Sequence, residues 1–494
     1  MKFFKDKKNM NSFKKLGVVF VVTLLMVSCN DFGSINTDPN NPSAVKTELL
    51  LTNALRSISG PLAAVDPVLY VQHMSETQYN ESSRYQGVNY DFSGYYTGPL
   101  RDLETIIELN TNDETKASVT TGGSNNNQIA VARIMKAYFY QLMTDRWGYL
   151  PYSEALEGSD NFTPAYDSQE SIYMDLITEL KEAVDQMDNG GDVSAGDFIL
   201  GGDMDRWAEF ANSLRARIAL RMSGVSGMAA TAKAEFEDAI SDGVITADVW
   251  YPYLSSSDNQ NPWYARFITR TDYAISDVLA DTLKALGDMR ATAFADPAPD
   301  TSNANGSTEL FEVIGLDYGL ENPGEVTNDE VSFPGQALRA QNAPLAIITV
   351  AEMQLAMAEA AENGWTTPGT AATHYANGIA ASWDQWGVTG DGTALTAYMA
   401  NPEVVYAGGA AGMDQIAYEK WVALYGNGYE AWSEWRRLDH PQLTPHPFPL
   451  NQSGEIPVRH GYPTSEAQLN SASYEAAVSA QGTDDTTTNL WWDN

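Results

Sequence analysis

Apolar side chains recur at steps of three and four residues along much of the chain, which is the pattern of amphipathic helices. Two stretches show it, with stripes formed by Val131, Ile134, Tyr138 and Leu142, and by Tyr173, Leu176, Leu180, Val184 and Met187. A third helix is predicted over residues 205–222, where one stripe is apolar and the opposite stripe carries Arg215, Arg217 and Arg221. This segment starts from an acidic cap position and stops before Gly224, and both features are helix-end signals.

A second group of helices is predicted in the C-terminal half. Pro344 suits the first turn of a helix, and the segment from there to Ala361 is so rich in Ala, Met, Leu and Ile that its helix must be buried on most sides. Further helices are predicted over residues 371–386, 414–425 and 429–438. Alanine-rich helical hairpins of this kind predict an all-α fold of tetratricopeptide-like helical pairs, although their spacing along the chain is irregular.

Four long segments show no sustained period. They cover residues 60–98, 249–271, 297–341 and 440–463. Long irregular segments within a compact domain are usually functional. We therefore expect one helical domain over residues 44–494, with loop-rich insertions near 60–98, 249–271 and 297–341 that frame a ligand-binding region.

The N-terminus has the pattern of an export signal. Six lysines within residues 1–15 precede an apolar run at residues 16–27, which is shorter than the ~20 residues needed to span a bilayer. The only cysteine, Cys29, follows directly in Leu-Met-Val-Ser-Cys, which resembles a bacterial lipobox. These features predict a signal peptide over residues 1–28, lipidation of Cys29, and a polar tether over residues 29–43. A buried free cysteine at the end of an ordinary signal peptide is the alternative.

Composition narrows the class of function. The chain has 29 Lys and Arg against 65 Asp and Glu, a net charge of −36, which opposes nucleic acids and anionic lipid surfaces. One cysteine excludes an internal disulfide, and five histidines leave little material for histidine-rich metal sites. No phosphate loop, dinucleotide fingerprint, zinc-protease motif or hydrolase nucleophile motif is present. We therefore expect no nucleic-acid partner, no cofactor and no enzymatic activity.

Several short motifs, in order along the chain, resemble those of one family. After the lipobox come Asn-Thr-Asp-Pro-Asn-Asn-Pro at 36–42, Asp-Arg-Trp-Gly-Tyr-Leu-Pro-Tyr at 145–152, Arg-Trp-Ala-Glu-Phe-Ala-Asn-Ser-Leu at 206–214, Ala-Pro at 343–344 with Ala-Glu-Ala at 358–360, Tyr-Glu-Ala-Trp-Ser-Glu-Trp-Arg-Arg at 429–437, and Trp-Trp-Asp at 491–493. Together they resemble the SusD/RagB nutrient-binding outer-membrane lipoproteins of Bacteroidota. Each motif is weak alone, but their order over nearly the whole chain is specific.

The resemblance implies a cellular location and a partner protein. A member of this family has a helical fold of tetratricopeptide-like pairs and lies on the cell surface, anchored in the outer membrane by its lipid. It also implies a SusC-like TonB-dependent transporter as partner and an oligo- or polysaccharide as ligand. The acidic charge favours a neutral glycan, with a β-glucan as the first guess.

Sugar recognition requires flat aromatic rings with polar side chains at the rim, and two aromatic segments outside the long helices offer both. We predict that Trp263 and Tyr264 form the main platform. The rings on the opposite side are Tyr85, Tyr95 and Tyr96, and the amide side chains at the rim are Asn89 and Asn261. Burial beneath a loop is the alternative for each ring. Trp432 and the pair Arg436 and Arg437 are expected in the core, as packing and internal ion pairs.

Other functions stay open. A peptide- or small-nutrient-binding member of the same family keeps every feature except the sugar, whereas a secreted glycoside hydrolase needs a carboxylate pair that abundance alone cannot identify. No metal site can be assigned from the sequence, although Asp38 and the loop at residues 122–127 could hold a structural calcium ion. Turn and capping roles are the stronger interpretation of both.

Overall fold

The protein is described from a computed structural model that covers residues 46–493 apart from 88, 190, 194, 303, 305 and 307. The chain divides into two compact units, Met1–Lys46 and Thr47–Asn494, and the fold below is that of the second. The predicted signal peptide, Cys29, Asp38 and the tether lie outside the described residues. No helix among the described residues is long and apolar enough to cross a bilayer.

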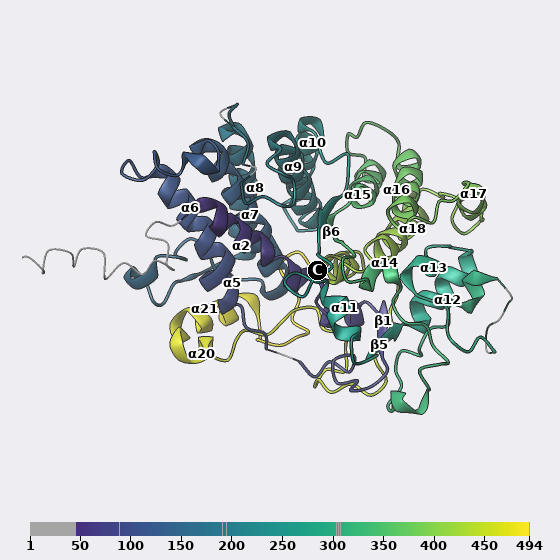
Figure 1. The fold of residues 1–494 in the computed structure, drawn as a ribbon. Helices are drawn as coiled ribbons and strands as arrows, with labels where there is room; N and C mark the ends of the chain where they lie inside the picture. The colour runs from purple at the N-terminus through teal and green to yellow at the C-terminus, as the bar shows by residue number, and fades with distance from the viewer. Residues whose placement is uncertain are drawn as a thin grey trace, which may run out of the picture. The chain divides into compact units, whose positions relative to one another are not determined.

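The N-terminal half of this unit is a series of packed helices. In chain order these are α2 (Thr47–Arg56), α6 (Arg101–Thr111), α7 (Asn125–Trp147), α8 (Gln169–Gln186), α9 (Met204–Arg221) and α10 (Ala229–Asp242). From α6 onward each helix packs against the next one in the chain, and α2 packs on α6. Figure 1 shows α6 to α10 following one another across the upper left of the view.

The C-terminal half has a second series. Its members are α15 (Val350–Glu362), α16 (Ala371–Gln385), α17 (Thr393–Met399), α18 (Gly409–Ala423) and α19 (Gly428–Leu438). Helix α15 packs against α16, α18 and α9, so it joins the two series, and α19 packs on α18. The predicted all-α fold of tetratricopeptide-like helical pairs is confirmed.

Shorter elements lie between and after these helices. The shorter α-helices are α3 (Ser59–Leu62), α4 (Asp66–Tyr70), α5 (Ser93–Tyr95), α11 (Pro262–Phe267), α12 (Asp277–Leu286), α13 (Ala291–Phe294), α14 (Gln336–Arg339), α20 (Glu466–Leu469) and α21 (Ser471–Gln481). A π-helical turn, η1 (Tyr96–Leu100), precedes α6. The 3₁₀ turns are η2 (Thr120–Gly122), η3 (Gly158–Asp160), η4 (Glu309–Glu312) and η5 (Pro323–Glu325).

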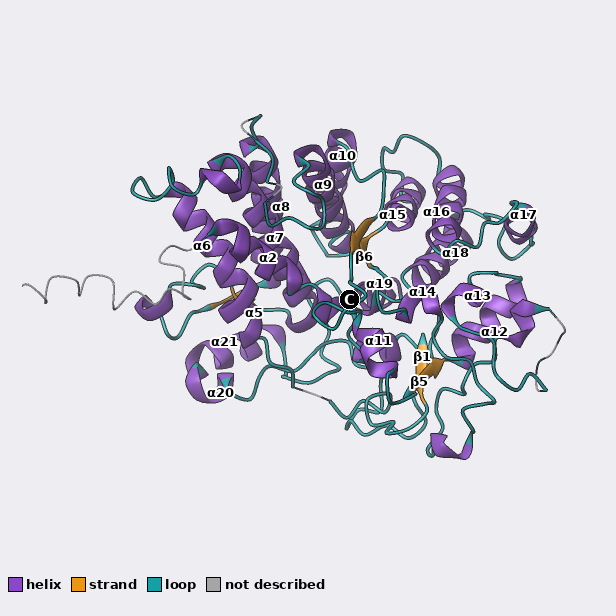
Figure 2. Cartoon of the chain, viewed as in Figure 1, coloured by secondary structure: helices purple, strands orange, loops and turns teal. Residues whose placement is uncertain are grey.

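The described strands form three antiparallel pairs. They are β1 (Met74–Glu76) with β5 (Tyr273–Ile275), β2 (Leu150–Pro151) with β3 (Tyr166–Asp167), and β4 (Val249–Tyr251) with β6 (Leu345–Ile348). In register, Ser75 lies opposite Ala274, and Tyr251 opposite Leu345. Figure 2 shows how few strands there are among the helices and how many loops surround β1 and β5.

Side-chain caps explain where the long helices begin. Ser124 starts α7 by accepting a hydrogen bond from the backbone N–H of Asn127 at 3.1 Å, and Asp203 starts α9 by accepting from Asp205 and Arg206. Such caps satisfy backbone donors that have no partner within the helix. Of the predicted helices, 205–222 and 371–386 match α9 and α16 to within a residue.

The prediction that Pro344 opens a helix is wrong. Residues Leu345–Ile348 form β6, which pairs with β4, and α15 begins only after Thr349. The Thr349 hydroxyl accepts from the backbone N–H of Glu352 at 3.1 Å. Two adjacent isoleucines favour a strand, and a partner strand far away in the sequence overrides the local helical pattern. The aromatic segment at 249–271 accordingly contains β4 and α11, and is not wholly irregular.

Buried charges join the two helical series. Arg221 on α9 pairs with Asp145 on α7 at 2.9 Å and with Glu430 on α19, and all three side chains are buried. Arg437 on α19 pairs with Glu359 on α15 at 2.6 Å. Charges buried this deeply require a partner, because an unpaired ion in the interior costs several kcal/mol. The core role predicted for Trp432, which has 0% of its surface exposed, and the internal pairing predicted for Arg437 are confirmed.

Candidate functional site

Trp263 does not form the exposed platform that the sequence predicted. Its side chain is 0% exposed. The ring lies edge-on to Tyr273, with centroids 5.8 Å apart, and the guanidinium of Arg266 lies 4.7 Å from its centroid. With both of these neighbours and no open face, Trp263 is a core residue that packs α11 against β5.

Asn261 and Tyr85 are also structural in this conformation, so their predicted roles in ligand contact are corrected. Asn261 is fully buried and caps α11: its side-chain oxygen accepts from the backbone N–H of Trp263 at 2.7 Å, and its amide donates to the carbonyl oxygens of Leu338 and Ala343. Tyr85 is 0% exposed, and its hydroxyl accepts from the backbone N–H of His446 at 2.9 Å. The amide of Asn261 thus fixes the segment that contains Leu338 and Ala343, and the hydroxyl of Tyr85 fixes the segment at His446.

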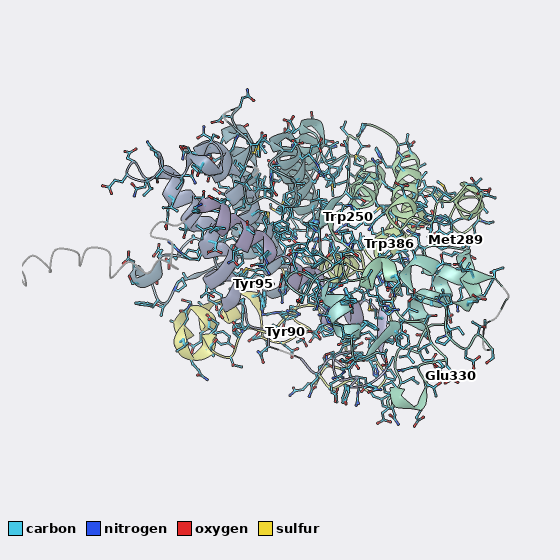
Figure 3. All side chains as sticks on the ribbon, viewed as in Figure 1. Tyr90, Tyr95, Trp250, Met289, Glu330 and Trp386 are labelled. Carbon is cyan, nitrogen blue, oxygen red and sulfur yellow. The ribbon has the colours of Figure 1, made fainter. Side chains whose placement is uncertain are left out.

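Tyr95 and Tyr96 are partly exposed, but both have their hydroxyls engaged. The Tyr95 hydroxyl accepts from Nη1 of Arg146 at 2.7 Å, and the Tyr96 hydroxyl donates to the carbonyl oxygen of Pro151 at 2.6 Å. Both rings pack against other aromatic side chains of the core. Figure 3 labels Tyr95 together with Tyr90, which lies on the same segment ahead of α6.

Asn89 and Tyr264 remain candidates at the surface. Asn89 is exposed, and its amide donates to the carbonyl oxygen of Tyr462 at 2.7 Å. Tyr264 is partly exposed on α11 and makes no hydrogen bond or ring contact within the described part of the chain. Among the described residues, no contact joins Tyr264 to Tyr95 or Tyr96, so the structure does not bring the predicted facing rings together.

Four loop segments meet around β1 and β5, and we call them the loop cluster. They are residues 77–86, 264–272, 318–328 and 444–450. Thr77 donates through its backbone N–H to the carbonyl oxygen of Asp272 at 2.8 Å, which joins the first two segments. The amide of Asn80 donates to the carbonyl oxygen of Leu320 at 2.7 Å. In Figure 1 these loops occupy the lower part of the view, around the labels β1, β5 and α11.

The fourth segment is held by Arg84. Its Nε donates to the carbonyl oxygen of Phe448 at 2.7 Å, and its own carbonyl oxygen accepts from the backbone N–H of Leu450 at 2.6 Å. The Tyr318 hydroxyl donates to the carbonyl oxygen of Ser83 at 3.2 Å. Backbone hydrogen bonds, together with side-chain hydrogen bonds to backbone carbonyl oxygens, therefore fix four segments that are far apart in the sequence to one another, which makes the loop cluster a defined surface.

Tyr79 is more exposed than the other aromatic rings described in the loop cluster. It is 67% exposed, and the guanidinium of Arg270 lies 4.8 Å from the ring centroid. Arg270 is itself fixed by Asp272, with 2.7 Å between Nε and Oδ2. Tyr79 has a φ of 55°, a left-handed conformation that is unfavourable for a tyrosine. Backbone strain of this kind collects at ligand sites, where the surrounding structure compensates for it.

Exposed apolar side chains are concentrated in the same place. Nine large apolar side chains are strongly exposed in the described part of the chain, and four of these belong to the loop cluster: Tyr79, Ile268, Phe448 and Leu450. Apolar groups that gather at one surface and are surrounded by polar groups mark binding sites. A flat, exposed ring backed by a cation, with apolar neighbours and amide groups nearby, suits the C–H face and hydroxyl edge of a sugar.

A buried carboxyl group supports the loop cluster. Glu76 ends β1 and accepts hydrogen bonds from the backbone N–H and the hydroxyl of Ser83, both at 2.9 Å. Burial raises the pKa of Glu76 to about 7, although the two hydrogen bonds oppose this change. Burial also lowers the pKa of Arg266, whose Nη1 is enclosed without a hydrogen-bond partner among the described residues. Glu76 and Arg266 therefore lie in a poorly hydrated environment.

The possible calcium loop at residues 122–127 uses its polar groups within the protein. The amide of Asn127 donates to the carbonyl oxygens of Asp188 and Gly191, both at 2.9 Å, and Ser124 caps α7. Among the described residues, no group of three or more His, Cys, Asp or Glu side chains is placed to hold a metal ion. Calcium binding at residues 122–127 stays a prediction.

Comparison with known proteins identifies the family. Residues 39–463 match the SusD-like family model described as "Starch-binding associating with outer membrane". The chain belongs to the SusD-like family. A search of curated proteins found no match. The family consists of nutrient- and glycan-binding proteins, and the resemblance noted from the sequence motifs is thereby confirmed.

Solved structures of family members share this fold. A chitin-binding protein is 29% identical with a TM-score of 0.78, and the alignment covers 91% of this chain and 100% of that one. A SusD homologue from Bacteroides fragilis is 23% identical with a TM-score of 0.79, over 91% of this chain and 100% of that one. A chitin-binding SusD homologue from Flavobacterium johnsoniae is 23% identical with a TM-score of 0.71, over 91% and 98%.

Proposed function

We propose that this protein captures a neutral, β-linked glycan at the loop cluster and delivers it to a TonB-dependent outer-membrane transporter. The observation that carries the proposal is Tyr79, an exposed ring held in a strained backbone conformation and backed by Arg270. A ring that is 67% exposed leaves apolar area that the C–H face of a sugar can cover.

The ligand class follows from charge and from similarity. The net charge of −36 opposes polyanionic glycans, and Arg84 and Arg270 in the loop cluster are already engaged with Phe448 and Asp272. A β-glucan remains the first candidate. The 29% identity to a chitin-binding protein supports chitin oligosaccharides as a second neutral β-linked candidate.

The place of action follows from the N-terminus and the family. The lipobox at Cys29 supports a lipid anchor, and the family description supports association with the outer membrane. A lipoprotein on the cell surface that binds a polymer needs a partner for import, because polysaccharides do not cross the membrane unaided. A SusC-like barrel is the partner that we propose.

Isothermal titration calorimetry on the detergent-solubilised full chain tests the ligand. Cellohexaose, chitohexaose and an alginate oligosaccharide of similar length are titrated in parallel, with a mixture of short peptides as a further arm. Binding of a neutral glycan, with affinity that changes little between low and high salt, is the expected result. Tight binding of alginate or peptide with both neutral glycans silent would refute the proposal and would favour another nutrient class.

We further propose that the protein binds its glycan without cleaving it. Two carboxyl groups at this site have structural partners: Glu76, next to the loop cluster, accepts a hydrogen bond from Ser83, and Asp272 pairs with Arg270. Prolonged incubation with cellohexaose or chitohexaose is expected to release no new reducing ends. Release that disappears when one loop-cluster carboxylate is changed to its amide would show a hydrolase instead.

A further inference from the structure

A cavity of about 450 Å³ lies between α6, α7 and α8, apart from the loop cluster. It lies within the ~300–1,000 Å³ that is usual for small-molecule sites. Figure 1 shows these three helices together at the upper left, whereas the loop cluster lies lower in the view. The residues that line the cavity are not among the predicted glycan-binding residues, so its contents require a separate account.

Tyr140 on α7 supplies the first evidence for a ligand. Its side chain is 2% exposed and lines the cavity, yet its hydroxyl makes no hydrogen bond within the described residues. Its ring packs edge-on against Tyr152, with centroids 4.7 Å apart. Burial raises the pKa of Tyr140, so this hydroxyl keeps its proton and can donate. A hydroxyl that faces a cavity and has no protein partner usually has a water molecule or a ligand as its partner.

Charges around the cavity are only partly neutralised. Three of the acidic side chains that line it are paired inside the protein: Glu104 with Lys136, Glu108 with Arg101 at 2.7 Å, and Glu179 with Arg133 at 2.8 Å. Each of these pairs removes one negative and one positive charge from recognition. Only the acidic groups without an ion pair can therefore attract a ligand by their charge.

Asp175 and Glu157 are two such groups. Asp175 accepts only a neutral hydrogen bond, from the Tyr152 hydroxyl at 2.7 Å, and Glu157 forms no ion pair in the described part of the chain. Both side chains are exposed, at the opening of the cavity. The site thus offers unpaired carboxylates at its mouth, a hydroxyl donor in its wall and aromatic rings between them.

We propose that this cavity is a second sugar site, which binds an amine-bearing unit such as glucosamine. The ammonium group pairs with Asp175, the Tyr152 ring contacts the sugar, and Tyr140 bonds a ring hydroxyl. A carboxylate with an aromatic ring suits a cation, whereas an N-acetylated sugar has no charge to pair. The assignment rests on the proposed glycan role of the protein, and it extends that role to partly deacetylated chitin fragments.

Calorimetry on the full chain in detergent tests this assignment. The probes are the disaccharide of glucosamine, its N-acetylated counterpart, cellobiose and the diamine putrescine. The glucosamine disaccharide is expected to bind at least ~10-fold more tightly than the two uncharged sugars, since charge-assisted bonds are the stronger ones. Binding of putrescine as tight as that of the disaccharide would show a general amine site and overturn the sugar assignment.

Three variants locate the binding. Asp175→Asn is expected to lower the affinity for the glucosamine disaccharide about 10-fold or more, since it loses the negative charge that pairs with the ammonium group. Tyr140→Phe is expected to lower it roughly 3- to 10-fold, since it loses a hydrogen-bonding hydroxyl. Tyr138→Phe is the matched control. It lies on the same helix, is 5% exposed, and has no hydrogen bond within the described residues, but it does not line this cavity. Wild-type affinity in both Asp175→Asn and Tyr140→Phe would overturn the proposal.

The same titrations separate this inference from the proposed function. If cellohexaose or chitohexaose binds and Asp175→Asn leaves the glucosamine disaccharide unaffected, the second site is wrong and glycan capture at the loop cluster stands. If no neutral glycan binds but the glucosamine disaccharide does, with the loss in Asp175→Asn, the loop-cluster proposal is wrong. Melting temperatures near the wild-type value confirm that each variant is folded.

Discussion

Tyr79 keeps an exposed aromatic ring in a left-handed backbone conformation, which costs roughly 1–3 kcal/mol without any gain in packing. Its neighbours in sequence, from Thr77 to Arg84, are almost all polar. A ring in such a segment has no apolar neighbour in sequence to fold against, so it stays at the surface. Trp263, by contrast, is buried. Asn261 and Pro262 start the helix α11, and Trp263 lies on the buried side of that helix.

Replacing Tyr79 by alanine should weaken binding of the neutral glycan roughly 5- to 30-fold. A stacked ring face covers enough apolar area to be worth about 1–2 kcal/mol, and 1.4 kcal/mol is a factor of ten in affinity. The melting temperature should change little, because the side chain is exposed and alanine keeps the Cβ that makes this φ unfavourable. Calorimetric titration and thermal denaturation measure both quantities.

Trp263→Ala and Trp432→Ala are the matched contrast. Both rings have 0% of their surface exposed, so each substitution should lower the free energy of unfolding by about 3–5 kcal/mol. If Tyr79→Ala leaves glycan affinity unchanged while Trp263→Ala abolishes it in protein that is still folded, the loop cluster around Tyr79 is not the site.

Glu76→Gln should make the protein less sensitive to pH. The folded-state pKa of Glu76 is raised to about 7 from an ordinary value of 4.5, so between these values the folded protein holds the proton more tightly than the unfolded chain. The stability that Glu76 contributes is therefore present below about pH 4.5 and is lost as the pH rises through about 7. The difference corresponds to at most ~3 kcal/mol.

Chemical denaturation at several pH values tests this expectation. Near pH 8 the glutamine variant should be more stable than the wild type by about 1–3 kcal/mol, because Gln still accepts a hydrogen bond from Ser83 and carries no charge. Near pH 4 the two proteins should be nearly equal. A variant that is less stable than the wild type near pH 8 would show that the ionised carboxylate is favoured in the folded protein.

At the scale of elements, the helices were predictable because their pattern is local. Helix α9 starts at an acidic cap and carries its apolar stripe in the sequence itself, so its bounds matched within a residue. Strand β6 was not predictable in this way, because its partner β4 lies about a hundred residues earlier and only the fold brings the two together. Periodicity can identify a helix but not a distant strand partner.

The candidate site was only partly predictable for the same reason. The two aromatic segments were found from the sequence, and the loop cluster does draw on both, through Tyr79 and through residues 264–272. Which ring is exposed depends on contacts between distant segments, such as Arg270 over Tyr79 or Tyr273 against Trp263. The polar surroundings of Tyr79 were the one local signal that could have selected it.

The ion pairs between helices should be strongly coupled to stability. Arg437 on α19 bonds Glu359 on α15 and Glu434 on its own helix, and all three side chains are buried. Arg437→Ala leaves two carboxylates near Lys420 with one cation fewer, which should cost about 3–5 kcal/mol in the free energy of unfolding. Urea denaturation measures the loss.

An exposed ion pair is the control for Arg437. Lys233 and Glu237, one helical turn apart on α10, are partly exposed and lie 3.7 Å apart. Lys233→Ala should change the free energy of unfolding by less than ~1 kcal/mol, since solvent screens such pairs. Equal effects of Lys233→Ala and Arg437→Ala would mean that burial of the α15–α19 contact contributes nothing.

At the scale of the whole molecule, the acidic charge constrains how the protein can meet a membrane. A chain with a net charge of −36 is repelled by anionic lipid headgroups, and no helix among the described residues is able to span a bilayer. We expect the lipid predicted at Cys29 to supply a stable attachment. One short acyl chain gives only marginal binding, whereas two or more buried chains at ~0.8 kcal/mol per CH₂ hold a protein firmly.

Cys29→Ala should consequently release the protein from the outer membrane while leaving its glycan affinity unchanged, because Cys29 precedes the unit that carries the loop cluster. Cell fractionation follows the release, and calorimetry on the released protein measures the affinity.

Pull-down of the wild type from solubilised outer membranes should also recover a large barrel protein. The released variant should capture less of it, because anchoring raises the effective concentration of the two partners. A variant that stays membrane-bound would contradict the lipid anchor. Recovery of the wild type alone would contradict the transporter partnership.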